Sequence, residues 1–143
     1  MKLVVDTNRI IAALIKDGMA RAIIQSSIFE FCTLNYVLEE VKKYMAYIIK
    51  KSDLKRDEIE LLFLLFMQNI AIVPDEKIKA KMPEALRIMK PIDPQDAPIL
   101  ACALAVSNQG IWTEDAHFDR QNKVRVWETK ELLGFIKSKG VKS

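Results

Sequence analysis

The segment KLVVDTNRIIAALI, residues 2–15, places a short run of aliphatic residues directly before an amphipathic stretch. Residues 2–5 are too few for a helix and rich in valine, so we predict a strand there. A helix is expected from about Arg9 to Ile15. A strand that leads at once into a helix is the first half of a βαβ unit. The segment therefore predicts an α/β fold with a parallel sheet.

The rest of the chain repeats this alternation of short apolar runs and longer amphipathic stretches. We predict further strands at 29–34, 70–73, 111–113 and 124–127, and helices at 19–26, 36–50, 54–67, 76–89, 95–107 and 129–137. Pro83 is expected to divide the helix at 76–89. The predicted architecture is a three-layer α/β/α domain over residues 1–143, with a central four- or five-stranded parallel sheet.

The composition excludes several classes of protein. The chain has 143 residues, of which 50% are hydrophobic and 29% charged, and this balance excludes disordered and collagen-like chains. The longest stretch without a polar side chain, 97–106, is shorter than the roughly 18 to 20 residues of a membrane span. Asp6 interrupts the first apolar run too early for a secretory signal. We therefore expect a cytoplasmic protein, with Cys32 and Cys102 as small core residues.

Acidic residues occur next to the predicted strands and helices. They are Asp6 after the first strand, Glu39 and Glu40 in the helix after the second, Asp93 and Asp96 before the helix at 95–107, and Glu114, Asp115 and Asp119 after the fourth strand. Each has an ordinary structural explanation as a helix cap, a partner of a helix dipole or a turn residue. Because parallel strands end at one edge of a sheet, we nevertheless expect Asp6, Glu40, Asp96 and Asp115 to converge there.

Several carboxylates in one place are stable at neutral pH only if one is protonated or a cation neutralises them. Oxygen ligands in a chain with one histidine favour Mg²⁺ or Mn²⁺ over zinc. A site of this kind is suited to phosphoryl chemistry. His117 is expected in a surface turn. The net charge of +3 does not by itself indicate a nucleic-acid partner, but gathering the acids at one edge would leave the remaining surface more basic.

Four motifs together resemble the PIN domain, a nuclease family that includes the VapC toxins. They are VVDTN at 4–8, LEEV at 38–41, DPQDAPILACALA at 93–105 and TEDAHFD at 113–119. The resemblance implies Mg²⁺- or Mn²⁺-dependent hydrolysis of RNA phosphodiester bonds. It implies that Asp6, Asp96 and Asp115 hold the metal and that Glu40 completes the ligand set or orients the attacking water. Asn8 and Thr113 correspond to supporting residues, and Asp93 and Asp119 are further candidates.

The leading hypothesis is an endoribonuclease, acting as the toxin of a VapC-type pair with a small antitoxin protein. The alternatives are a non-catalytic RNA-binding or protein-interaction module on the same fold, and a receiver-type phosphoacceptor domain. The segment LLFLLFM, residues 61–67, is apolar nearly all round a predicted helix. Such a helix is buried within the chain or packs against a second copy, so we also expect a homodimer.

Overall fold

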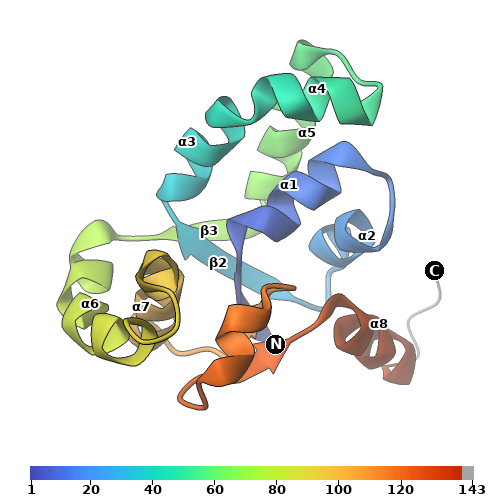
Figure 1. The fold of residues 1–143 in the computed structure, drawn as a ribbon. Coiled ribbons are helices and arrows are strands. Elements are labelled where there is room, and N and C mark those ends of the chain that lie inside the picture. Colours follow the sequence, from blue (N-terminus) through green and yellow to red (C-terminus); the bar gives the residue numbers. More distant parts are fainter. Residues whose placement is uncertain (140–143) are drawn as a thin grey trace.

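The computed structural model describes residues 1–139, so the last four residues of the predicted domain lie outside the described residues. A five-stranded sheet with the order β3-β2-β1-β4-β5 forms its centre (Figure 1), and every neighbouring pair is parallel. The strands are β1 (Lys2–Val5), β2 (Glu30–Leu34), β3 (Ile70–Val73), β4 (Ile111–Trp112) and β5 (Val126–Trp127). This parallel sheet confirms the predicted α/β fold class.

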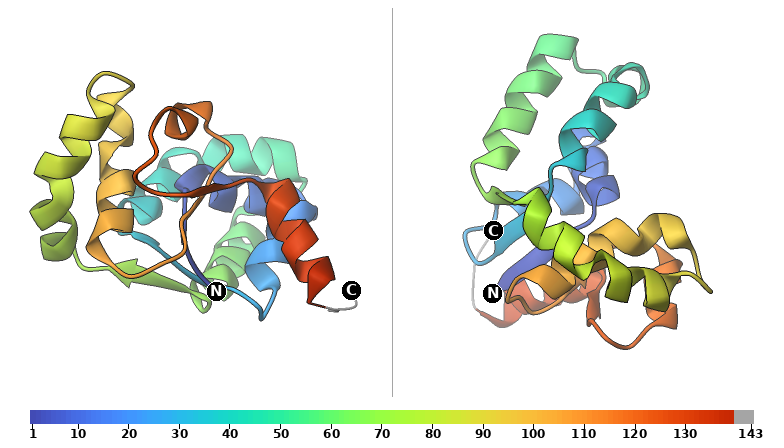
Figure 2. Two further views of the ribbon diagram at one scale, coloured as in Figure 1. Left: turned by 90° about the horizontal axis from the view of Figure 1, so that it is seen from below. Right: turned by 90° about the vertical axis from the view of Figure 1, so that its left-hand side faces the viewer.

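Helices cover both faces of the sheet (Figure 2). The helices are α1 (Thr7–Ile15), α2 (Met19–Gln25), α3 (Tyr36–Lys43), α4 (Met45–Ser52), α5 (Arg56–Met67), α6 (Asp75–Met89), α7 (Ala97–Ala105) and α8 (Thr129–Ser138), with short 3₁₀ turns η1 (Pro94–Asp96) and η2 (Ala116–Arg120). Alternate residues of β1 face opposite layers. Leu3 and Val5 belong to the core with α1, α2, α4, α5 and α8, and Val4 belongs to the core with α6 and α7. The result is a three-layer α/β/α arrangement.

The helix predicted at 36–50 is two helices, α3 and α4. Tyr44 leaves helical geometry with φ −98° and ψ 11°, and the chain changes direction there. Tyr44 is consequently exposed, and its neighbour Met45 is buried instead. The bend allows α4 to pack against α1 and α5.

The prediction that Pro83 divides its helix is wrong, because α6 runs without a break from Asp75 to Met89. A proline inside a helix removes one backbone N–H, which leaves the carbonyl of the residue four positions earlier, Lys79, without its donor. Both Pro83 and Lys79 are exposed, so water can hydrogen-bond to that carbonyl.

The helices α4 and α5 project away from the sheet as an arm (Figures 1 and 2). On α5, Ile59 and Phe66 are buried, whereas Leu61, Leu64 and Leu65 are exposed. The segment 61–67 is therefore only partly buried within this chain. Over the part of the chain that the structure describes, no helix has the length and apolar character needed to cross a membrane.

Candidate functional site

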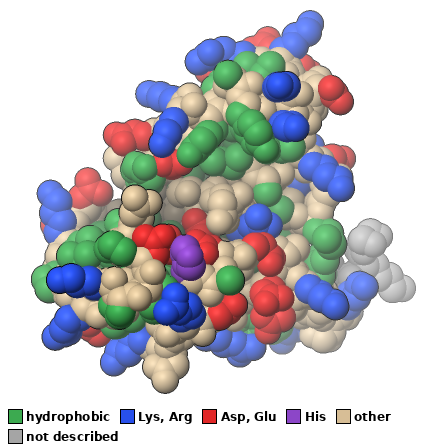
Figure 3. All heavy atoms as spheres, in the orientation of Figure 1, with side chains coloured by type: hydrophobic (Ala, Val, Ile, Leu, Met, Phe, Trp, Pro, Cys, Tyr) green, Lys and Arg blue, Asp and Glu red, His purple; other side chains and the backbone are tan. Residues whose placement is uncertain are grey.

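A cleft of about 710 Å³ lies at the sheet edge where β1, β2 and β4 end. Figure 3 shows acidic side chains around the single histidine of the chain in this region. The residues that line the cleft are Asp6, Thr7, Asn8, Leu34, Tyr36, Glu40, Lys43, Gln95, Asp96, Pro98, Ile99 and Asp115. The four acids that we expected to converge are all among them.

Hydrogen bonds link Asp6, at the end of β1, to the segment after β4. The Thr113 hydroxyl donates to Oδ2 of Asp6 over 2.7 Å, and the backbone N–H of Asp115 donates to the same hydroxyl oxygen over 3.0 Å. Thr113 is only 1% exposed, so the fold holds its side chain in this orientation. Thr113 therefore positions Asp6 relative to Asp115, as groups behind metal ligands commonly do.

The closest cluster at the site consists of Asp93, Asp96 and His117. Nδ1 of His117 lies 3.0 Å from Oδ2 of Asp96, and 3.4 Å from a carboxylate oxygen of Asp93 and from one of Asp115. In each of the three side chains of this cluster one atom of a type that can bind a metal ion lies within 4.8 Å of the corresponding atoms of the other two. No other group of three such side chains within residues 1–139 is as close. Asp6 lies outside this group, although it lines the same cleft.

Three of the aspartates also cap short helical segments. Oδ1 of Asp6 accepts a hydrogen bond from the N–H of Asn8 at the start of α1. Asp93 and Asp115 make the same kind of cap at the starts of η1 and η2. Each cap uses Oδ1 of its aspartate. Oδ2 of Asp6 accepts the Thr113 hydroxyl and Oδ2 of Asp93 lies 3.4 Å from Nδ1 of His117, so the second oxygen of these two carboxylates faces other groups of the site. The structural role expected for such residues is therefore compatible with a functional one, because capping also fixes the direction of the carboxylate.

Glu40 reaches the cleft from the opposite side, on α3. It is half-buried and lines the cleft, whereas Glu39 lines a separate hollow next to α6. The nearby carboxylate of Glu40 raises the pKa of Tyr36. Of the two glutamates, Glu40 is thus the one that lines the cleft together with the aspartates.

The further candidates Asn8, Asp93 and Asp119 do not all lie at the site. Asn8 lines the cleft, and its side-chain oxygen accepts a hydrogen bond from Nε of Arg9 over 3.2 Å. Asp93 lies in the cluster around His117. Asp119 is exposed in η2 and is not among the residues that line the cleft.

The acids of the cleft oppose one another's ionisation. Burial raises the pKa of Asp6 above its ordinary value, and the charge of Asp115 adds to this, while the hydrogen bond from Thr113 acts in the opposite direction. Burial also raises the pKa of Asp96, and the charges of Asp115 and Asp93 contribute. The hydrogen bond to Asp96 and the surrounding negative charge raise the pKa of His117.

The donor set fits a divalent cation. Neighbouring carboxylates that resist ionisation become stable anions when a cation lies between them. Aspartate oxygens suit hard divalent cations, and an imidazole nitrogen is a donor for transition-metal ions. Asp93, Asp96 and His117 could hold a divalent ion, and Asp6 and Asp115 line the adjoining cleft.

A family model described as PIN domain matches residues 4–134. The chain belongs to the PIN domain family. Searches of curated proteins and of solved structures found no significant match. PIN domains are in general nucleases that use a divalent metal ion and act on RNA or DNA. The match contains all the acids of the cleft, and it confirms the family that the four sequence motifs indicated.

His117 lies beside the PIN cleft, in contact with Asp96, and the sequence did not predict this contact. The expected surface turn is confirmed, because His117 lies in η2 with its side chain 45% exposed, but a single histidine in a turn gave no sign of a partner. Its position two residues after Asp115 was the available signal. Asp115 accepts the backbone N–H of His117 over 2.9 Å, and this cap helps to place the imidazole beside Asp96.

We expect the metal-free PIN domain to lose thermal stability as the pH rises from about 4. Asp6, Asp96 and His117 all have raised pKa values in the folded chain. Such a group binds a proton more tightly when folded, so the stability it contributes is lost as the pH rises through its folded pKa. Melting curves in EDTA between pH 4.5 and 8.5 measure this decline.

The Asp6→Asn variant is the control for this pH effect. It should raise the metal-free melting temperature at pH 8 by roughly 2 to 5 °C, because it removes a buried charge. Mn²⁺ or Mg²⁺ at 100 times its Kd should stabilise the wild type by about 2.7 kcal/mol and the variant much less. A melting temperature in EDTA that rises steadily with pH would contradict this account of the cleft.

Proposed function

We propose that this protein is a metal-dependent endoribonuclease that hydrolyses RNA phosphodiester bonds. The observation that supports the proposal most is the gathering of Asp6, Glu40, Asp96 and Asp115 around one cleft of a PIN domain. In this proposal Asp6, Asp96 and Asp115 hold Mg²⁺ or Mn²⁺. When bound, such an ion lowers the pKa of a water molecule and offsets the charge that develops on the phosphate.

The protein side chains have separate tasks in this reaction. Thr113 holds the carboxylate of Asp6, and His117 holds that of Asp96. Glu40, on the α3 side, orients the attacking water or takes up its proton. Lys43 lines the cleft as a cation and can contact a phosphate of the RNA.

Cleavage of a labelled single-stranded RNA tests the proposal. We expect products with internal cuts when Mn²⁺ or Mg²⁺ is present and none in EDTA. DNA of the same sequence and duplex RNA, run beside it, define the substrate class. RNA binding without cleavage under every condition would instead favour a non-catalytic RNA-binding or protein-interaction module.

We propose further that the nuclease is the toxin of a VapC-type pair, held inactive by a small antitoxin protein. The support is the order and spacing of the four acidic motifs. Induced expression of the wild type should stop growth of the host cells, and expression of Asp96→Asn should not. Unimpaired growth with active wild-type enzyme would favour a processing nuclease over a toxin.

A homodimer formed through α5 is part of the same proposal. Leu61, Leu64 and Leu65 are 61%, 64% and 46% exposed, and together they form an apolar surface on this helix. Leucines at this exposure gain free energy when a second copy covers them. We expect light scattering after size exclusion to give twice the chain mass for the wild type.

The Leu64→Lys variant should give the monomer mass without a lower melting temperature of the monomer fold. Leu86→Lys on α6 is the matched control, because Leu86 is also an exposed leucine, at 41%. It should leave the dimer intact. A wild type that is monomeric at every accessible concentration would exclude the dimer.

A further inference from the structure

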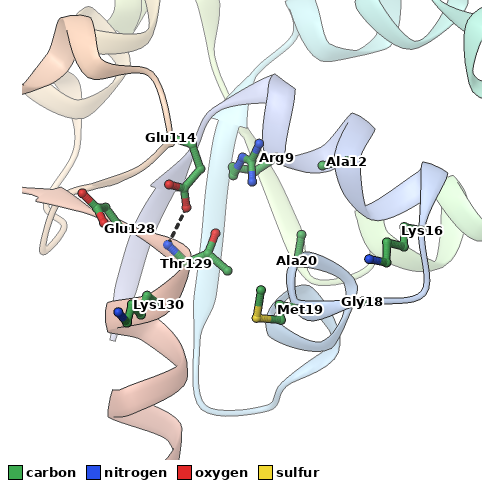
Figure 4. Close-up of a pocket in the computed structure, with 10 residues that line it drawn as sticks. All are labelled: Arg9, Ala12, Lys16, Gly18, Met19, Ala20, Glu114, Glu128, Thr129 and Lys130. Atoms are coloured by element: carbon green, nitrogen blue, oxygen red, sulfur yellow. Dashed lines mark hydrogen bonds between the residues drawn. The ribbon is translucent and has the colours of Figure 1, made fainter.

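A second cavity, of about 480 Å³, lies beside the acidic cleft between α1, the start of α2 and the start of α8. Its volume is within the range of about 300 to 1,000 Å³ that is usual for small-ligand sites. Figure 4 shows it with Arg9 and Lys16 on one wall, Glu128, Thr129 and Lys130 on the other, and Met19 and Ala20 between them. None of the tasks proposed for the acidic cleft uses it.

The base of this cavity is apolar. Met19 is 60% exposed there, next to Ala20, with Ala12 on the α1 side. A methionine side chain on an open surface is flexible and polarisable, and it packs well against flat rings. The apolar base therefore suits an aromatic group such as a nucleobase.

The walls of the cavity carry three cations and two acids, a net charge of +1. Arg9, Lys16 and Lys130 line it, and the aliphatic part of Lys16 packs next to Gly18. Of the two acids, Glu114 is already engaged, since its carboxylate accepts the backbone N–H of Thr129 over 2.7 Å. Glu128 lies at the outer edge of the α8 wall (Figure 4).

Arg9 connects the second cavity to the acidic cleft. It lines the cavity, while Asn8, the residue before it, lines the cleft. Nε of Arg9 donates to Oδ1 of Asn8 over 3.2 Å, and the positive charge of Arg9 acts to lower the pKa of Asp6. A strand that leaves the cleft past Arg9 would enter the second cavity directly.

We propose that the second cavity binds one nucleotide of a single-stranded RNA, one position beyond the two nucleotides joined by the phosphodiester bond that lies in the acidic cleft. The base packs on Met19 and Ala20, and its phosphate lies near Arg9 and Lys16. Proteins that hold single strands without reading the sequence combine stacking of the bases on aromatic side chains with contacts to the phosphates. Here the apolar Met19 and Ala20 take the place of the aromatic side chain. This inference rests on the proposed ribonuclease function, whose substrate it extends beyond the cleaved bond.

The test measures RNA binding separately from cleavage. In an Asp96→Asn background, which should leave the RNA uncut, fluorescence anisotropy gives the Kd of a fluorescein-labelled six-nucleotide RNA. The Lys16→Gln/Lys130→Gln pair should raise this Kd about tenfold at 0.1 M salt and reduce the salt dependence, since each lost phosphate contact lowers the slope by about 0.7. Met19→Asp should raise the Kd by a similar factor.

The Lys77→Gln/Lys81→Gln pair on α6 is the matched control, because both lysines are exposed and the net charge changes equally. It should leave the Kd within about twofold of the parent. In the otherwise wild-type chain, a dinucleotide is too short to reach the cavity, so every one of these variants should cleave it at the same rate.

Two results would overturn the inference. One is a six-nucleotide Kd that is the same for the cavity variants and the α6 control, and the other is an equal effect of the cavity variants on the dinucleotide. Absence of metal-dependent cleavage by the wild type would instead overturn the ribonuclease proposal, whichever way the cavity variants behave in the binding measurement. The two failures are therefore distinguishable.

Discussion

Asp96→Asn is expected to lower the rate of metal-dependent RNA cleavage on the order of 10³-fold. The asparagine side chain has nearly the same shape and keeps an oxygen for His117, but it loses the negative charge that a divalent ion requires. Burial and the nearby charges of Asp115 and Asp93 raise the pKa of Asp96. The side chain therefore lies among other negative groups. Single-turnover cleavage of a short RNA at saturating Mn²⁺ measures the loss.

Asp119→Asn is the matched control for this experiment, since it makes the same chemical change at an acid that is exposed in η2. It should retain cleavage within about threefold of the wild type. Far-UV circular dichroism should show both variants folded. Equal cleavage rates for the wild type and Asp96→Asn would show that Asp96 takes no part in the reaction. They would also contradict the shared metal site.

Gly110→Ala is expected to destabilise the fold by about 3 to 5 kcal/mol, which combines backbone strain with steric overlap. Gly110 precedes β4 and has a φ of +136°, a conformation that residues with a side chain rarely adopt. A Cβ at this position would lie 2.4 Å from the carbonyl oxygen of Arg125, which accepts the N–H of Ile111, and 2.9 Å from Cδ1 of Trp127. The substitution therefore pushes β4 and β5 apart.

Thermal or urea unfolding measures this effect, and Gly134→Ala provides the contrast. A Cβ at Gly134, in α8, meets nothing within 4 Å, so alanine there should stabilise the fold by about 0.5 to 1 kcal/mol through its better helix propensity. Because β4 leads into Thr113, Gly110→Ala should also lower nuclease activity. Equal unfolding midpoints for the two variants would show that the chain before β4 adapts to the side chain.

Most of the strand positions were predictable because a strand covered on both faces is an uninterrupted apolar run. This held for Lys2–Val5, in which Leu3, Val4 and Val5 are fully buried. The bounds of Ile70–Val73 also agree with the prediction, although this edge strand exposes Ala71 and Ile72. The last strand was predicted too long: 124–127 contains only the two residues of β5, Val126 and Trp127. Local apolar content does not show where a neighbouring strand ends, and pairing with β4 sets the length of β5.

The helix breaks were less predictable for a related reason. The apolar pattern predicted one continuous helix through Tyr44, and the chemistry of proline predicted a break at Pro83. In the structure Tyr44 is exposed at the bend between α3 and α4, and Pro83 lies on an exposed part of α6. Whether a helix bends at Tyr44 or continues through Pro83 depends on the elements that pack against it. The order of apolar and polar residues along the chain does not contain this information.

The sequence by itself determined the α/β class, the family and the location of Asp6, Glu40, Asp96 and Asp115 beside the predicted strands and helices, because these features depend on local spacing. Only the tertiary structure decided that His117 joins Asp93 and Asp96, that Asp119 stays outside the cleft, and that Arg9 borders a second cavity. The physical reason is that these distances depend on the strand order β3-β2-β1-β4-β5 and on the direction in which each helix cap turns a side chain. Both are set by contacts between residues far apart in the chain.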